Sequence, residues 1–369
     1  MLHTTNTSVI SLHSDEMKSE AIKDAGFACP VPLPAGGRVL LGHGSGGKLS
    51  AQLLKDVFLP KLGNPVLDRL EDQAIVCLNE TRLAITTDSF VVKPLFFRGG
   101  DIGSLAVHGT INDLAMGAAK PLWMSVAFIL EEGLPMETLH RVVASMQGAA
   151  ANAGVQIVTG DTKVVEKGSA DGIYINTTGI GLVREGISLS ASAARPGDAV
   201  IVSGMLGDHG IAILAEREGL KFDTEVKSDS AALYELVATL LDATREVRCM
   251  RDPTRGGLSS TLNEIAGSSH VGIELEDASI PVREEVRGAC EMLGLDPLYV
   301  ANEGKLVAIV APEAADRALS ALRSHPLGAE AQIIGRVTKE HPRMVVARTT
   351  FGTTRIVDML AGDQLPRIC

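Results

Sequence analysis

The sequence predicts a two-domain protein of the mixed α/β and α+β class. Short β-like runs and helical runs alternate along most of its 369 residues. The segment Arg-Pro-Gly-Asp at 195–198 separates an earlier series of such runs from a later one. A chain of this length allows two or three domains, and 45% hydrophobic with 21% charged residues is typical of a globular protein with a large core. We therefore expect domains at residues 38–190 and 191–345.

The two ends of the chain are expected to lie outside these domains. Residues 1–37 are polar and finish in the Pro- and Gly-rich stretch CPVPLPAGG, which predicts a flexible leader. Residues 346–369 are expected to form a last strand and a mobile tail, because the end of the chain, MLAGDQLPRIC, contains Gly and Pro and shows no periodicity. Eleven extended residues reach up to roughly 35 Å, so the tail can travel between two sites.

The first domain is predicted to combine strands with two helices. Its strand candidates are rich in Ile, Val and Thr, and span 83–92, 123–130, 155–160 and 172–183. Its helix candidates span 102–118 and 136–154.

The second domain is predicted to begin with a strand and then to mix helices and strands, as the first does. Its strand candidates span 199–204, 305–311, 332–337 and 343–349. Its helix candidates span 209–219, 230–247, 257–269, 282–294 and 314–325.

Charge and cysteine content exclude several classes of protein. The net charge of −11, with no basic run, argues against a nucleic-acid partner. The five cysteines form no C-x-x-C pair and are odd in number, so neither a disulfide framework nor a zinc site is indicated. The first residues lack the pattern of a signal peptide, and the longest near-apolar run, PLWMSVAFIL, is too short to span a bilayer. These features predict a cytoplasmic protein without a membrane partner.

A glycine-rich segment at 42–48, GHGSGGK, almost matches the phosphate-binding P-loop pattern. Leu49 stands where that pattern requires a hydroxyl for magnesium. The segment is therefore not a P-loop, and any magnesium ligands must come from elsewhere in the chain.

Aspartates beside predicted strands and helices offer such ligands. Magnesium prefers hard oxygen donors and usually combines a few carboxylates with phosphate oxygens. Asp is also a common turn and helix-capping residue, so each of these side chains has a structural alternative. The aspartates are Asp72, Asp88, Asp113, Asp161 and Asp252.

The order of these motifs resembles that of a known superfamily. The chain carries, in sequence, GHGSGGK, EDQA, TTDSF, INDLAMGA, GDTK, GMLGDHG and DPTRGGL, spread over about residues 38–345. This order is similar to that of the PurM-like ATP-binding superfamily, which includes aminoimidazole ribonucleotide synthetase, selenophosphate synthetase and thiamine-monophosphate kinase. The terminal Pro366-Arg367-Ile368-Cys369 further resembles the C-terminal signature of HypE, a family of hydrogenase maturation factors.

The resemblance implies a fold, a reaction and partners. It implies a two-domain PurM-like fold whose N-terminal half forms a sheet or barrel at the interface of a homodimer. It implies that a partner carbamoyltransferase, HypF, loads a carbamoyl group onto Cys369, and that ATP with Mg²⁺ drives its dehydration to a thiocyanate. The product would supply the cyanide ligand of [NiFe]-hydrogenase through an iron-carrying HypC–HypD complex.

The resemblance also implies roles for individual residues. Cys369 would carry the substrate, and Lys163 or Glu303 would act as the base that removes the amide protons. The magnesium ligands would be Asp72, Asp88, Asp113 and Asp252. Contacts to the nucleotide would come from Gly44, Gly46, Gly47, Lys48, Asp72, Asp88, Asn112, Asp113 and Asp161.

Two other functions are compatible with parts of the sequence. One is another ATP-dependent small-molecule kinase or synthetase of the superfamily, such as a selenophosphate synthetase. The other is a nucleotide-binding scaffold that presents its tail to maturation partners. Neither the kinase nor the synthetase explains the terminal Pro-Arg-Ile-Cys.

Overall fold

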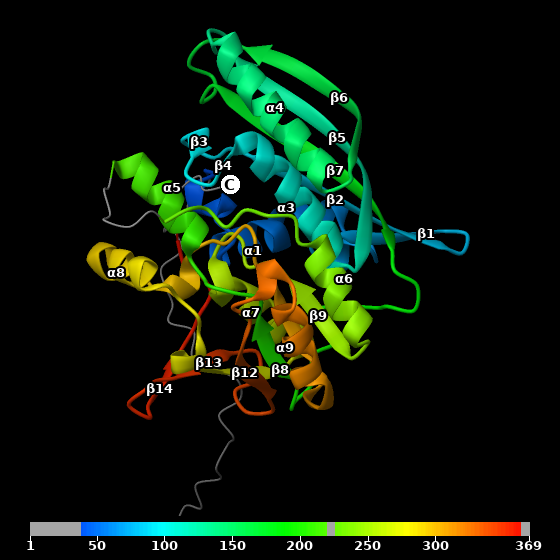
Figure 1. The fold of residues 1–369 in the computed structure, drawn as a ribbon, viewed down its shortest axis with the longest axis vertical. Coiled ribbons are helices and arrows are strands. Elements are labelled where there is room, and N and C mark those ends of the chain that lie inside the picture. The colour runs from blue at the N-terminus through cyan, green and yellow to red at the C-terminus, as the bar shows by residue number, and fades with distance from the viewer. Residues whose placement is uncertain (1–37, 220–225, 363–369) are drawn as a thin grey trace, which may run out of the picture. The chain divides into compact units, whose positions relative to one another are not determined.

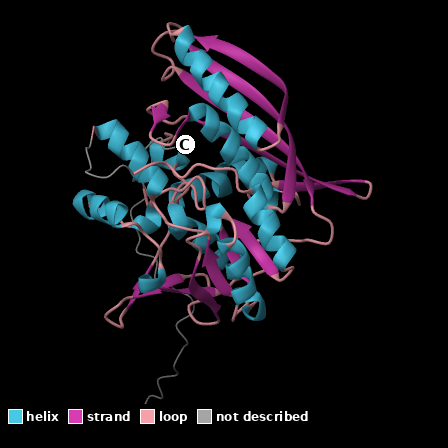
Figure 2. Ribbon diagram, in the orientation of Figure 1, coloured by secondary structure: helices cyan, strands magenta, loops and turns pink. Residues whose placement is uncertain are grey.

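The computed structural model describes residues 38–219 and 226–362, which belong to one compact unit (Figure 1). The predicted leader at 1–37 and the end of the predicted tail, including Cys369, lie outside the described residues. Figure 2 shows that strands and helices are mixed throughout the chain. The predicted mixed α and β class is therefore confirmed.

The first sheet has five strands in the order β1-β2-β7-β5-β6. Its neighbours are antiparallel except β5 and β6, which are parallel. The strands are β1 (Ala74–Leu78), β2 (Thr81–Phe90), β5 (Ala119–Glu131), β6 (Gln156–Val165) and β7 (Ile173–Val183). Of these, β1 was not predicted, and β5 and β6 are longer than the sequence indicated.

Two helices cover one face of the first sheet. They are α3 (Ile102–Met116) and α4 (Met136–Asn152). Asp101 caps α3 by accepting hydrogen bonds from the backbone N–H groups of Gly103 and Ser104. Most of α3 is buried because it also contacts α6 and β9 of the second half of the chain. This helix therefore joins the two halves, and its side chains can reach both. A short hairpin of β3 (Phe96–Phe97) and β4 (Gly100–Asp101) precedes it.

The second sheet has seven strands in the order β14-β13-β10-β12-β8-β11-β9. Its strands are β8 (Ala199–Val202), β9 (Val247–Arg251), β10 (Gly272–Glu276), β11 (Val307–Val310), β12 (Gln332–Thr338), β13 (Val345–Arg348) and β14 (Thr354–Ile356). Its helices are α5 (Asp208–Glu218), α6 (Tyr234–Ala243), α7 (Gly257–Ser269), α8 (Glu284–Leu293) and α9 (Ala315–Arg323). The predicted boundary near residue 190 lies in the loop between β7 and β8.

Helices lie on both faces of this sheet. The strand β8 alternates between them: Val200 and Val202 pack in the cluster that includes α7, whereas Ile201 packs in the cluster that includes α6 and α9. A strand buried on both faces reads as a continuous apolar run, as Ala-Val-Ile-Val does.

One helix prediction in this half was wrong in extent. A single helix was expected at 230–247, but α6 ends at Ala243 and the chain turns into strand β9 at Val247. Thr244 adopts extended backbone geometry, and Val247 pairs with β11. Tertiary pairing overrides the local helical pattern here.

The chain begins its described part with short helical segments. These are a 3-10 turn at Leu41–Gly44, α1 (Lys48–Leu53), a π-helical turn at Leu54–Phe58, α2 (Leu59–Leu62) and a 3-10 turn at Leu67–Arg69. Within 38–219 and 226–362, we find no helix that is both long and apolar enough to cross a membrane.

Candidate functional site

A small cavity of about 190 Å³ gathers acidic side chains from distant parts of the chain. Five of the predicted site residues line it: Asp72, Asp88, Asp113, Asp252 and Glu303. Its other lining residues are Ser89, Phe90, Gly109, Thr254 and Arg255. The structure thus brings together all four predicted magnesium ligands and one of the two predicted bases.

Ordinary elements of the fold aim these carboxylates at the cavity. Asp88 shares the face of β2 with Ala84 and Thr86, which is the face covered by α3. Asp113 projects from α3 and accepts a hydrogen bond of 2.7 Å from the Thr86 hydroxyl. Asp252 follows directly on β9, and Glu303 lies in the loop before β11. The cavity therefore lies where the helix that joins the two halves meets the second sheet.

The cavity holds more negative charge than its surroundings balance. Burial raises the pKa of Asp113 and of Asp252 well above the ordinary carboxyl value, and repulsion between neighbouring aspartates raises both further. Burial likewise raises the pKa of Glu303 well above its ordinary value. Arg255 lowers the pKa of Asp88 and of Glu303, but burial outweighs it for both. Such a cluster favours a bound cation or a shared proton.

Oxygen donors of this kind fit Mg²⁺ by their chemistry. Among the described residues, however, no three acidic, cysteine or histidine side chains are close enough to hold a metal ion by themselves. Magnesium is usually bound by one or two carboxylates together with waters and phosphate oxygens. The observed arrangement therefore suits a metal that arrives with a nucleotide better than a resident structural ion.

Arg251 positions one of the carboxylates. Its side chain is 8% exposed, and its Nη1 lies 3.0 Å from Asp72 Oδ1 and 2.8 Å from Glu264 Oε2. Its Nη2 donates a hydrogen bond to the carbonyl of Leu70. The guanidinium therefore fixes the loop before β1, and with it the carboxylate of Asp72.

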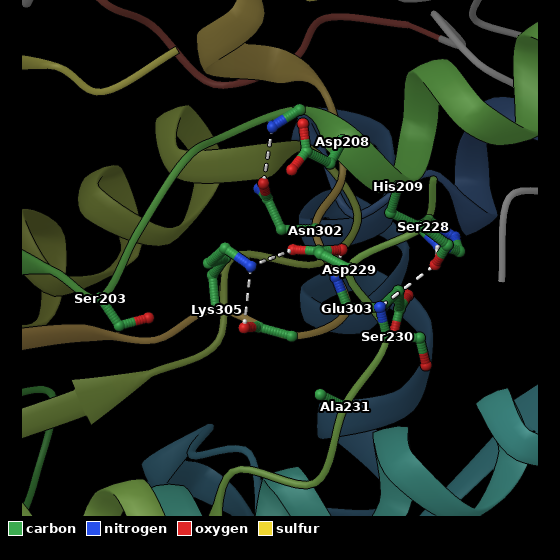
Figure 3. A network of polar contacts seen from close by, with 12 residues as sticks. Ser203, Asp208, His209, Ser228, Asp229, Ser230, Ala231, Asn302, Glu303 and Lys305 are labelled. Carbon is green, nitrogen blue, oxygen red and sulfur yellow. Dashed lines mark hydrogen bonds and ion pairs between the residues drawn. The ribbon is translucent and has the colours of Figure 1, made fainter. Parts of the chain in front are cut away.

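Glu303 sits in a loop that neighbouring side chains hold firmly (Figure 3). Its backbone N–H donates to Asp229 Oδ1 at 3.0 Å, and its carbonyl accepts from Asn112 Nδ2 at 3.2 Å. Lys305 forms a buried ion pair with Asp229 at 3.0 Å. Within the described chain, Glu303 Oε1 is buried and has no hydrogen-bond partner. An unsatisfied buried carboxyl oxygen is costly to leave unpaired, which favours a ligand contact there.

Asn112 lies behind the cavity rather than on its wall. Its Nδ2 donates to the carbonyls of Ala231 and Glu303, and its Oδ1 accepts from the Leu233 N–H. These contacts position Glu303, and the nucleotide contact of Asn112 stays a prediction. Asn302 makes a similar link, since its Nδ2 donates to the carbonyl of Pro253, next to Asp252.

Asp161 and Lys163 lie away from the cavity of their own chain. Both are on the edge strand β6, with exposed side chains that form an ion pair of 2.6 Å. Strands β7 and β5 separate β6 from β2, so about 14 Å lies between Asp88 and that edge. The register pairs Asp161 and Lys163 with Ala127 and Ile129, which occupy the sheet face opposite to Asp88. The expected convergence of these two residues on the aspartates does not occur within one chain.

The glycine-rich segment contacts the beginning of the C-terminal tail. Lys48 Nζ lies 2.5 Å from Asp358 Oδ2, and the Lys48 N–H donates to the carbonyl of Leu360. Arg255, which lines the cavity, donates to the carbonyl of Gly44 at 2.9 Å. Gly44 therefore lies next to a cavity residue, while Lys48 is already paired with a carboxylate.

Sequence reasoning missed Arg251, Asp229 and Lys305. Arg251 precedes Asp252 in RDPTRGG and Lys305 follows Glu303 in NEGK, so proximity to motif residues could have indicated both. Asp229 lies in the segment Ser-Asp-Ser, which carries no recognisable pattern.

A half-buried histidine next to this network gives a pH-dependent prediction. His108 Nδ1 lies 3.0 Å from Ser230 Oγ, and burial lowers the pKa of His108 to about 4, opposed in part by Asp101. The unfolded chain, with a histidine pKa of about 6.5, binds the proton more strongly, so stability is lost as pH falls from about 6.5 to 4. We expect His108→Gln to reduce the loss of unfolding free energy between pH 7 and pH 4.5 by about 2 kcal/mol in urea titrations. The exposed His140→Gln is the control, and an unchanged loss in His108→Gln would contradict the prediction.

Two family models match the chain. The model described as the AIR synthase related protein, N-terminal domain, matches residues 70–183, and the corresponding C-terminal domain model matches residues 195–347. The predicted PurM-like fold is therefore confirmed.

Characterised relatives match almost the whole chain. It is 56% identical to the carbamoyl dehydratase HypE of Cupriavidus necator, over 93% of this chain and 98% of that protein. It is 48% identical to the carbamoyl dehydratase HypE of Escherichia coli, over 90% of this chain and 99% of that protein.

Solved structures agree with these relatives. A crystal structure of a HypE–HypF complex matches with a TM-score of 0.80 and 49% identity, covering 84% of this chain and 99% of that chain. HypE in complex with ATP matches with a TM-score of 0.76 and 50% identity, covering 90% and 100%. The thiamine monophosphate kinase of Aquifex aeolicus, at 20% identity and a TM-score of 0.62, shares the fold alone.

Proposed function

Because the chain belongs to the HypE family of carbamoyl dehydratases, we propose that it dehydrates a carbamoyl group carried on its own Cys369. The S-carbamoyl group (a thiocarbamate) loses one water, and ATP is converted to ADP and phosphate. The product is a thiocyanate on the same sulfur, which supplies the cyanide ligand for maturation of a [NiFe]-hydrogenase. The near full-length identity of 56% to a carbamoyl dehydratase is the observation that carries this proposal.

The reaction must break a carbon–oxygen bond and remove two protons from nitrogen. Transfer of the γ-phosphoryl group of ATP to the carbamoyl oxygen turns that oxygen into a phosphate leaving group. Glu303 is the base that we favour in the cavity of the same chain, because its carboxyl is buried there with one oxygen unpaired. A raised carboxyl pKa suits a group that must accept a proton.

The aspartates of the cavity are proposed to hold Mg²⁺ together with the phosphates. The metal, when bound, neutralises the charge that develops as the phosphoryl group is transferred. The ligands would be Asp72, Asp88, Asp113 and Asp252, of which Arg251 holds Asp72 in place. Without the metal these carboxylates repel one another, so nucleotide and metal should bind together.

The remaining predicted contacts to ATP come from the glycine-rich segment and from Asp161, and they differ in their surroundings. Gly44 has open space around it and is joined to Arg255, so it is best placed to meet a phosphate. Gly46, Gly47 and Lys48 contact Arg255 or the tail in this structure. Asp161 could serve a nucleotide only from outside its own cavity.

A homodimer is proposed because the first sheet exposes an apolar face. Opposite to α3 and α4, Trp123, Ile129 and Leu182 project from the neighbouring strands β5 and β7, and each is more than 40% exposed. An apolar sheet face of this kind usually marks an interface, and a second copy of the chain would cover it symmetrically. Asp161 and Lys163 lie on this same face, so a partner subunit could receive them at its own cavity.

Other partners follow from the family. HypF would load the carbamoyl group, and the HypC–HypD complex would take the cyanide to iron. We place the reaction in the cytoplasm, where free thiols persist.

The proposed function can be tested by the mass of the C-terminal peptide. The protein is loaded with carbamoyl phosphate and HypF, and the peptide is weighed with and without Mg-ATP. We expect Cys369 to gain a carbamoyl group and to lose one water only when ATP is present, and Cys369→Ser to gain neither change. Hydrolysis of ATP with an unmodified wild-type peptide would contradict the proposal.

A further inference from the structure

The beginning of the C-terminal tail, residues 358–362, lies against the glycine-rich segment at 44–48. Three contacts join these opposite ends of the described chain. Lys48 pairs with Asp358 at 2.5 Å, and the Lys48 N–H donates to the Leu360 carbonyl at 2.8 Å. Ser45 Oγ donates to the Gly362 carbonyl at 3.2 Å. The contacts use backbone as well as side chains, so they define one path for the tail.

Two of the three glycines in this segment are required by packing. A Cβ on Gly47 would lie 2.2 Å from the carbonyl oxygen of Leu360. Gly46 has a φ of +73°, and a Cβ there would lie 2.7 Å from the Arg255 carbonyl oxygen. Gly44 has no atom within 4 Å of its Cβ position. The close approach of the tail explains why residue 47 is a glycine, and the close approach of Arg255 explains why residue 46 is one. Neither explanation requires a bound phosphate.

Helix α7 holds the same stretch of chain from its other side. Ser259 Oγ donates to the Asp358 carbonyl at 2.5 Å, and Asn263 Nδ2 donates to the Val357 carbonyl at 2.8 Å. Val357 is fully buried. The tail thus leaves the core at Val357 and is held between α7 and the glycine-rich segment as far as Gly362.

We propose that residues 44–48 form a docking site for residues 358–362 of the tail, which fixes the position of Gly362. This inference rests on the proposed function, in which Cys369 carries the reacting group. Cys369 is seven residues from Gly362 in the sequence, so the two can be at most about 25 Å apart. Both the site that loads Cys369 and the site that dehydrates it must lie within that distance of Gly362.

Docking also raises the concentration of Cys369 near the cavity. Release of the tail up to Asp358 lengthens the free segment from seven to eleven residues. Effective concentration falls roughly as the −3/2 power of length, so the released tail should deliver Cys369 about twofold less often. The docking segment adds a positioning role to the glycine-rich motif.

Two alanine substitutions in the same segment provide the first test. Gly47→Ala should expel Leu360, whereas Gly44→Ala enters open space. The Lys48 N–H, which donates to the Leu360 carbonyl, reports on this contact. We expect its hydrogen exchange, measured in a peptide covering residues 45–53, to become at least about tenfold faster in Gly47→Ala and to stay at the wild-type rate in Gly44→Ala. Equal protection of this peptide in Gly47→Ala and wild type would overturn the docking site. Thermal melting checks that both variants are folded.

A charge swap provides the second test and does not depend on glycine. Lys48→Glu and Asp358→Lys should each speed exchange of the same peptide, and the double variant should restore protection if the two side chains meet. If the effect of the double variant on hydrogen exchange equals the sum of the effects of the two single variants, the pairing of Lys48 with Asp358 is contradicted.

The rate of water loss from carbamoylated Cys369 tests the positioning role. In Gly47→Ala we expect a rate about twofold below that of wild type, with an unchanged ATP concentration for half-maximal rate. Suppose that Gly47→Ala raises the ATP concentration for half-maximal rate but leaves hydrogen exchange at the wild-type rate. Gly47 would then serve the nucleotide instead of the tail, and the proposal would be overturned. If wild type itself loses no water, the proposed function fails, while the exchange experiment still decides whether the tail docks.

Discussion

Glu303→Gln should stop the reaction after Cys369 has been carbamoylated. The amide is nearly the same size as the carboxyl but cannot accept a proton from the substrate nitrogen. General-base catalysis is typically worth about 10²- to 10⁴-fold, so the rate of water loss should fall by that factor. The ATP concentration for half-maximal rate should change little, because the contacts of the Glu303 backbone with Asp229 and Asn112 do not involve the substituted atoms.

The measurement is the same peptide mass after loading by HypF. Glu303→Gln should accumulate the carbamoylated peptide in the presence of Mg-ATP, whereas wild type converts it. Glu276→Gln, on β10 and outside the cavity, is the matched control and should convert it at the wild-type rate. Wild-type conversion by Glu303→Gln would assign the proton transfer to another group.

Asp229 and Lys305 hold Glu303 in place among the carboxylates, and neither of them was predicted from the sequence. The Lys305 side chain is 11% exposed, and its charge is balanced by Asp229, whose other oxygen accepts the Glu303 N–H. A buried ion pair adds little stability by itself but strongly restricts geometry. Asp229 is 74 residues from Glu303 in the sequence, so their contact depends on tertiary structure that no local pattern contains.

The predicted aspartates that line the cavity have a local signal in the sequence. Asp88 lies within β2, Asp113 lies within α3 and Asp252 follows β9, and such elements can be recognised from apolar periodicity. Their meeting point was inferred from a resemblance to known motifs, not from periodicity. The end of the helix predicted at 230–247 failed for the opposite reason, since pairing of β9 with β11 competes with a local helical pattern.

Lys163 shows a second limit of sequence reasoning. The motif GDTK identifies Lys163 as a candidate base, but the face of the sheet on which Lys163 lies depends on the strand register. Because side chains alternate between the two faces of a sheet, this register places Lys163 on the face opposite to that of Asp88, which is the exposed apolar face. A residue with the right chemistry on the wrong face of its own subunit is explained if the partner subunit uses it.

Mixed dimers of Lys163→Ala and Glu303→Gln should recover activity that neither variant has alone. Each single variant is expected to lose at least about 10²-fold in the rate of water loss. If every site combines Glu303 of one subunit with Lys163 of the other, a mixed dimer contains one site with both defects and one intact site. Co-expression in equal amounts gives half mixed dimers, so total activity should reach about a quarter of wild type.

The alternatives give different amounts of recovery. If both residues act within one subunit, each site of a mixed dimer keeps one defect, and activity stays at the level of the single variants. If Lys163 takes no part, Lys163→Ala alone is as active as wild type, and of the two candidate bases only Glu303 remains. Two different affinity tags isolate the mixed dimer. Substitution of the exposed Trp123 by Glu places a charge within the apolar face, so it should prevent formation of the dimer and abolish the recovery of activity. Recovery that survives Trp123→Glu would mean that the two subunits exchange Lys163 through some other surface.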